Sequence, residues 1–176
     1  PRRLIQYVNF TQRGHSWAVN TPCQQAVAEM LVRADQPYQG FGSYYLWLND
    51  MYERKRKAML RAIEESGMKP ICPKGAYYIM VDAAKYINVL RARGVFKEID
   101  VKDPTTYYDW QFVQWLIEKV GVATIPGSAF YDYSKFNKDS KFEYIRFAYC
   151  TADETIQETA GRLKMIPKLL MTHSKL

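Results

Sequence analysis

The sequence has no long hydrophobic run. Its apolar stretches, such as residues 77–81, are only a few residues long, whereas a helix that crosses a bilayer needs about 18 consecutive apolar residues. We therefore expect no membrane-spanning helix. Glycine-rich phosphate-binding loops of the P-loop and dinucleotide-binding types are missing as well, so nucleotide-dependent chemistry is not expected within these residues.

Cysteine and histidine are scarce. The three cysteines are Cys23, Cys72 and Cys150, and the two histidines form no ligand pair beside them. Because the cysteines are odd in number, widely separated and not arranged as CxxC, the sequence predicts neither a zinc site nor a disulfide framework. No signal peptide is visible either, and together these absences favour a reducing intracellular compartment.

The composition is that of a folded domain. Hydrophobic residues make up 48% and charged residues 24% of the 176 positions, whereas disordered chains combine low hydrophobicity with unbalanced charge. The length suits one hydrophobic core. The 25 basic residues exceed the 18 acidic ones by seven, an excess that permits attraction to polyanions without requiring it.

The spacing of apolar residues predicts helices over residues 21–33, 43–66, 106–120 and 151–167. Residues 1–20 show no clear period. The third helix is expected to start with a capping box made by Thr106 and Asp109. In the second helix, the basic residues 54–57 interrupt the apolar stripe, which predicts a solvated midsection in a helix that links two packed regions.

Three β-rich segments, residues 77–81, 121–125 and 142–149, predict strands. After the long helix the order is strand, helix, strand, strand, helix. This order describes an α/β or α+β sandwich with its helices on one face of the sheet.

Arg146 lies within the last predicted strand. Side chains alternate between the two faces of a strand, so Tyr144 and Ala148 lie on the same face as Arg146, and Ile145 and Phe147 lie on the other face. A guanidinium keeps its charge, and its planar fork matches a carboxylate through two parallel hydrogen bonds. The residues alone leave two interpretations open: a structural ion pair with one of the 18 acids, or recognition of a substrate carboxylate.

Other candidates carry weaker signals. Residues 125–131 form a strand end and a turn where backbone amides and the Ser128 hydroxyl can face a ligand, although most such turns are plain connections. His15 stands beside Trp17 and can act as a base, but no nucleophile can be paired with it. The basic run 54–57 suits either a nucleic-acid surface or a solvated helix face of mixed charge.

Four motifs taken together resemble the C-terminal part of class I aminotransferases, which use pyridoxal phosphate. The resemblance extends from Thr21 to Pro167, and residues 24–29 are closest to the kynurenine aminotransferase branch, also called glutamine transaminase K or cysteine-S-conjugate β-lyase. The motifs are Lys74-Gly75-Ala76-Tyr77-Tyr78, Gly121-Val122-Ala123, Ile125-Pro126-Gly127-Ser128-Ala129-Phe130-Tyr131 and Tyr144-Ile145-Arg146-Phe147.

The resemblance implies a fold type I enzyme. Residues 1–40 would be the end of its large cofactor-binding domain, residues 41–67 a long interdomain helix, and residues 68–176 the small C-terminal domain with a free tail. It also implies a homodimer with shared active sites, amino transfer from an L-amino acid to a 2-oxo acid, and pyridoxal 5'-phosphate as cofactor. Neither nucleic acid nor membrane is an implied partner.

The resemblance also assigns residues to the substrate site. Arg146 matches the arginine that binds the substrate α-carboxylate, and Trp17 matches an aromatic residue that reaches into the neighbouring subunit's pocket. His15, Ser16 and Ser128 would lie at the pocket rim.

The family's Schiff-base lysine has no counterpart in the sequence, because its motif would lie upstream of Pro1. We therefore expect a C-terminal fragment that is inactive alone and has no catalytic residue of its own. The alternative is a non-enzymatic basic α/β module that binds nucleic acid or serves in dimerisation. The terminal Ser174-Lys175-Leu176 matches a peroxisomal import signal, so we expect a cytoplasmic or a peroxisome-type location.

Overall fold

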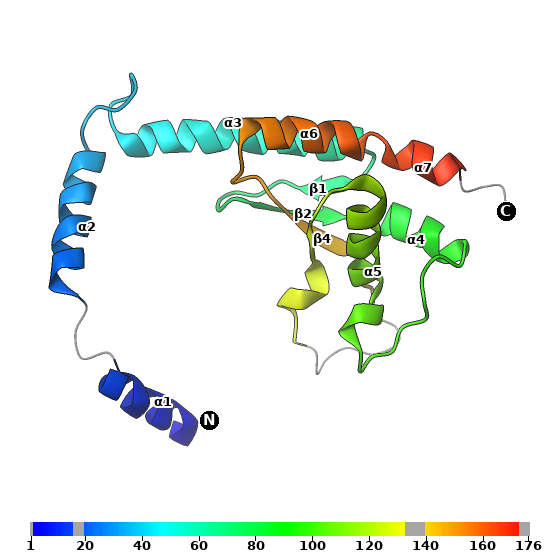
Figure 1. The fold of residues 1–176 in the computed structure, drawn as a ribbon, viewed down its shortest axis with the longest axis horizontal. Helices are drawn as coiled ribbons and strands as arrows, with labels where there is room; N and C mark the ends of the chain where they lie inside the picture. The colour runs from blue at the N-terminus through cyan, green and yellow to red at the C-terminus, as the bar shows by residue number, and fades with distance from the viewer. Residues whose placement is uncertain (1, 16–19, 133–139, 173–176) are drawn as a thin grey trace. The chain divides into compact units, whose positions relative to one another are not determined.

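A computed structural model describes residues 2–15, 20–132 and 140–172. The chain divides into two compact units, Pro1–Asp50 and Met51–Leu176, which we treat separately (Figure 1). The division falls within one long helix, α3 (Tyr44–Glu65), which the sequence predicts over residues 43–66. Gly67 ends this helix with a φ of +86°, as expected for a glycine C-cap.

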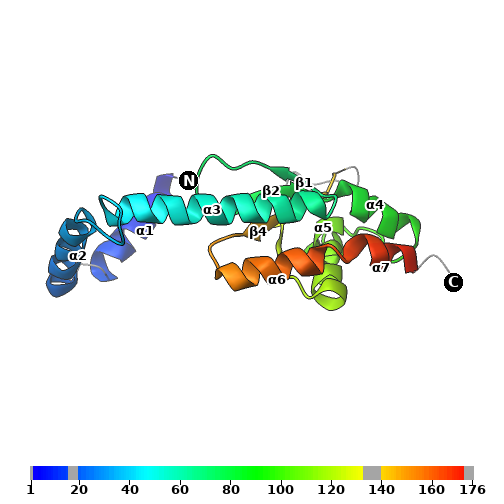
Figure 2. The ribbon, with the colours of Figure 1, turned by 90° about the horizontal axis from the view of Figure 1, so that it is seen from above.

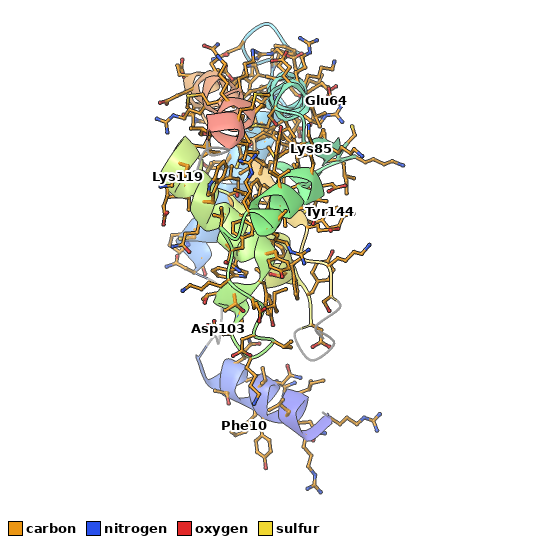
Figure 3. The ribbon with its side chains drawn as sticks, turned by 90° about the vertical axis from the view of Figure 1, so that its right-hand side faces the viewer. Phe10, Glu64, Lys85, Asp103, Lys119 and Tyr144 are labelled. Atoms are coloured by element: carbon orange, nitrogen blue, oxygen red, sulfur yellow. The ribbon has the colours of Figure 1, made fainter. Side chains whose placement is uncertain are left out.

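The first unit contains α1 (Arg2–His15), α2 (Thr21–Ala34) and the start of α3. Helix α1 is a correction, because no clear period was recognised in residues 1–20 and no helix is predicted there. Its apolar side chains do not mark a buried stripe, because all of them are exposed, and Phe10 is 80% exposed and points away from the helix (Figure 3). The sequence nevertheless signals this helix, since Leu4, Ile5 and Val8 recur at helical spacing.

The second unit is built on an antiparallel four-stranded sheet with the order β1-β2-β4-β3. The strands are β1 (Lys69–Ile71), β2 (Tyr78–Asp82), β3 (Ile125–Pro126) and β4 (Tyr144–Ala148). The predicted strand over residues 121–125 is wrong for residues 121–124. Gly121 has a φ of +74° and the Val122 N–H donates to Leu116 O, so these residues close the preceding helix.

Five helices of the second unit contribute to one hydrophobic core with the sheet. Besides α3, they are α4 (Ala84–Ala92), α5 (Tyr108–Trp115), α6 (Asp153–Leu163) and α7 (Ile166–Thr172). A π-helical turn, Leu116–Val120, extends α5. The segment after Pro167, expected to be a free tail, is helical as far as Thr172, and Leu170 is buried. Pro167 is tolerated because it stands in the first turn.

The sheet has one buried face and one open face. Ile79 and Val81 of β2 pair with Phe147 and Ile145 of β4, and all four are buried in the core. The alternate residues, which include Tyr78, Met80 and Arg146, lie on the opposite face. The expected α/β class with helices on one face of a sheet is therefore confirmed, and Arg146 lies on the face opposite the helical core.

Within the basic run of α3, Lys55 is bound to the start of α6, whereas Lys57 is 61% exposed, so the predicted solvated midsection holds for only part of the run. Lys55, whose side chain is only 13% exposed, donates to Thr151 O and lies 3.4 Å from an Asp153 carboxylate oxygen. At the other end of the pair of helices, Lys164 lies 2.9 Å from Glu65. These contacts align the Met51–Glu65 part of α3 with α6, side by side in Figures 1 and 2. No helix of the described residues is long and apolar enough to span a membrane.

Candidate functional site

Arg146 is held between two aromatic rings. It lies on β4, opposite Met80 of β2 and Ile125 of β3. Its guanidinium carbon is 4.0 Å from the Tyr78 ring centroid and 4.1 Å from that of Phe130. Both distances are within the range of a cation–π contact, so the charged group lies close to two aromatic rings while its N–H groups remain hydrogen-bond donors.

No carboxylate of the described residues forms an ion pair with Arg146. Its Nε is buried and has no hydrogen-bond partner within that part of the chain. Burying a charged donor without a partner is costly. The structural ion pair that the sequence left open is therefore not found among the described residues, and the geometry suits an external carboxylate.

Phe130 reaches Arg146 through a short 3-10 turn, Gly127–Phe130. The Ser128 N–H donates to Asp109 Oδ2 at 2.7 Å, and the Tyr131 N–H donates to Ser128 O at 3.2 Å. At Gly127 the turn approaches β4 so closely that an added Cβ would lie 2.7 Å from Tyr144 O. The turn is thus fixed against α5 on one side and against β4 on the other.

Tyr78, the second ring, follows a turn with unusual backbone geometry. Ala76 has a φ of +58°, a conformation that residues with a Cβ rarely adopt. The Tyr149 hydroxyl donates to Ala76 O at 2.7 Å, and the Tyr149 N–H donates to Tyr77 O at 3.0 Å. Tyr149, directly after β4, therefore stabilises the turn that leads into Tyr78.

Asp109 is the residue that sequence reasoning missed. The expected capping box is wrong, because the Thr106 hydroxyl donates to Asp103 O while Asp109 is fully buried and accepts the Trp110 and Ser128 N–H groups. A signal was present in the sequence. Asp109 stands on the same helical stripe as Phe112 and Leu116, and an acid on an apolar stripe needs a buried donor.

Burial raises the pKa of the Asp109 carboxyl, and the hydrogen bond from the Ser128 N–H opposes this shift. Because the folded pKa lies above the unfolded one, the stabilisation that protonation gives is complete below the unfolded pKa, about pH 4. It is lost as the pH rises through the folded pKa.

We therefore expect the free energy of unfolding of the wild type to fall, relative to that of Asp109→Asn, as the pH rises from below about 4 to neutrality. The variant provides the reference because its side-chain amide does not titrate. Urea denaturation of both proteins at each pH measures the difference. If the difference is the same at every pH, Asp109 has no raised pKa.

Of the other predicted site residues, only Ser128 has a described side chain. Ser128 is 2% exposed and its Oγ has no partner among the described residues. It lines a cavity of about 250 Å³ together with Asp109, Glu143 and Tyr144. Trp17 and Ser16 lie outside the described residues, as does the terminal Ser174-Lys175-Leu176. His15 is the last residue of α1, and its side chain is not described.

Beside Arg146, strands β2 and β4 offer no lysine that fits the covalent anchor of pyridoxal phosphate. That anchor is a lysine amine that can form a Schiff base. The central strands β2 and β4 present no lysine on the open face beside Arg146. Lys55, Lys57 and Lys164 form ion pairs on α3 and α6. The described residues also contain no cluster of three or more metal ligands.

Comparison with known proteins gives consistent matches. The family described as aminotransferase class I and II matches residues 2–163. The kynurenine–oxoglutarate transaminase of Dictyostelium discoideum is 30% identical over 96% of this chain, and the bovine kynurenine–oxoglutarate transaminase 3 is 31% identical over 93%. The match spans 37% and 34% of those two proteins, about a third of their length.

A solved structure has the same fold over most of this chain. The Escherichia coli protein identified as a methionine aminotransferase superposes with a TM-score of 0.62 and 25% identity. The match covers 94% of this chain and 35% of that one. The architecture described above thus corresponds to about a third of that fold.

Proposed function

Since the chain belongs to the family of class I and II aminotransferases, we propose that it supplies the substrate-carboxylate site of an enzyme that transfers an amino group from an L-amino acid to a 2-oxo acid. Arg146 carries this proposal. Its guanidinium is in cation–π contact with both Tyr78 and Phe130, and its Nε is without a partner among the described residues. Such a site matches a planar carboxylate by shape and by charge.

In this proposal the chain binds and orients the substrate. Two hydrogen bonds from the Arg146 edge fix the α-carboxylate, and the rings of Tyr78 and Phe130 shield the guanidinium faces from water. Fixing the carboxylate limits rotation of the substrate and so holds its Cα–H bond in one direction. Bound pyridoxal phosphate would act as the electron sink of such a reaction.

We propose that the cofactor's lysine anchor and phosphate site belong to a part of the protein outside these 176 residues, because the sequence lacks the family's lysine motif and spans about a third of its relatives' length. The 176-residue chain alone would then be inactive. By the same proposal residues 1–40 belong to the large domain, residues 41–67 link the domains, and the active unit is a homodimer. The relatives' names favour kynurenine or methionine among the amino donors.

The test compares the complete natural protein with the 176-residue chain. Each is assayed for visible absorbance of a pyridoxal Schiff base and for 2-oxo-acid-dependent turnover of L-kynurenine, L-glutamine, L-methionine and L-phenylalanine. We expect colour and turnover only in the complete protein. Turnover by the 176-residue chain would contradict its inactivity, and a complete protein without turnover of any L-amino acid would contradict the proposed function.

A further inference from the structure

We propose that Asp109 is a positioning residue for carboxylate binding: it holds the Gly127–Phe130 turn so that the Phe130 ring stays stacked on Arg146. The proposal rests on the proposed function of Arg146 and extends it to a residue on another element. Asp109 lies on α5, whereas Arg146 lies on β4.

A buried hydrogen bond connects Asp109 to the Gly127–Phe130 turn. Asp109 is fully buried, and its Oδ2 accepts the Ser128 N–H at 2.7 Å. A buried hydrogen bond to a carboxylate is stronger than one between neutral groups. This bond joins α5 to the turn two residues before Phe130.

Burial does not hold Phe130 in place against Arg146. The residue is 53% exposed, so it has little apolar packing of its own. Its place on Arg146 depends on the path of the turn, which is fixed by the Asp109 bond at Ser128 and by the close approach of Gly127 to Tyr144 O. Loss of the Asp109 bond removes one of the constraints on this turn.

Displacement of Phe130 would change the surroundings of Arg146. Phe130 and Tyr78 are both in cation–π contact with the guanidinium, at 4.1 and 4.0 Å from its central carbon. Without Phe130 the exposed face is hydrated and the guanidinium can turn out of the plane that suits a carboxylate. Substrate affinity would fall, while the charge of Arg146 is unchanged.

A double-mutant cycle in the complete protein tests this coupling. Asp109→Asn keeps the size of the side chain but replaces one of its two accepting oxygens with an NH₂ group, and Phe130→Ala removes the ring. We expect each change to raise the KM for the L-amino acid about three- to thirtyfold, the range of a cation–π contact. The double variant should be no worse than the more impaired single variant, because Asp109 acts through Phe130.

If the two effects multiply, or if Asp109→Asn leaves KM unchanged, Asp109 does not act through Phe130 and the proposal is wrong. Ser66→Ala is the matched control. Ser66 is also buried, and its hydroxyl donates to Ile63 O at 2.6 Å at the end of α3. This variant should lower stability without changing KM.

A second measurement does not depend on activity. In an NMR spectrum of the 176-residue chain, the Nε–H signal of Arg146 should be shifted by the ring currents of Tyr78 and Phe130. Asp109→Asn should move this signal toward its position in Phe130→Ala, and an unmoved signal would overturn the proposal. Because no substrate or cofactor is present, this result stands even if the transaminase assay fails.

Discussion

Replacing Arg146 with alanine should lower kcat/KM of the complete enzyme for its L-amino acid by about one and a half to three and a half orders of magnitude. Removing one partner of a desolvated, hydrogen-bonded charge pair costs about 2–5 kcal/mol, and each 1.4 kcal/mol is about a factor of ten. Arg146→Lys should fall between the wild type and Arg146→Ala, because it keeps the charge but not the planar fork. Steady-state kinetics with varied amino donor measures the effect.

Arg91 offers a matched control for this substitution. It lies on α4 and its guanidinium carbon is also 4.0 Å from a ring centroid, that of Tyr108. Arg91→Ala therefore removes a stacked arginine elsewhere in the same unit, and kcat/KM should stay close to the wild-type value. Equal losses in the two variants would show that the Arg146 effect reflects general damage to the fold.

Gly127→Ala should destabilise the second unit by about 1–3 kcal/mol, the usual cost of overpacking. The added Cβ would lie 2.7 Å from Tyr144 O and 3.0 Å from Tyr144 Cβ, and neither atom can move without shifting β4. Since β4 carries Arg146 and the turn carries Phe130, we also expect weaker substrate binding. Urea denaturation measures the loss of stability, and KM measures the loss of binding.

Gly161→Ala is the control for this change. Gly161 lies in α6, where an added Cβ would meet no atom within 4 Å. An alanine in an exposed helix interior is favoured over glycine by about 0.5–1 kcal/mol, so this variant should be more stable than the wild type. A Gly127→Ala protein as stable as Gly161→Ala would contradict the close approach of the turn to β4.

The sequence predicted the elements that have a regular apolar period. Residues 43–66 and 142–149 were identified because their apolar side chains recur at helical or strand spacing, and α3 and β4 lie within these ranges. The faces of β4 were predicted for the same reason. Helix α1 was missed although Leu4, Ile5 and Val8 recur at helical spacing. Helix α2 is equally exposed but opens with Thr21-Pro22, whereas α1 has no such start signal.

The site was predicted only in part. Arg146 stood out because a permanent charge inside an aromatic strand needs a partner. The rings that cover it come from residues 68 and 16 positions away in the sequence, and no local pattern predicts that Tyr78 and Phe130 meet there. Asp109 was misread because an acid near a helix start usually caps that helix, whereas its Ser128 partner lies 19 residues further on.

The central claim is that Arg146 recognises a carboxylate, and a pair of inhibitors tests it most directly. 3-Phenylpropionate ends in a negatively charged carboxylate that only accepts hydrogen bonds. 3-Phenylpropionamide is the same molecule with a neutral amide in that place, which also donates them. We expect the wild-type complete enzyme to bind the carboxylate more tightly than the amide by at least about tenfold, and Arg146→Ala to bind both equally. An Arg146→Ala enzyme that keeps the full preference for the carboxylate would contradict the account.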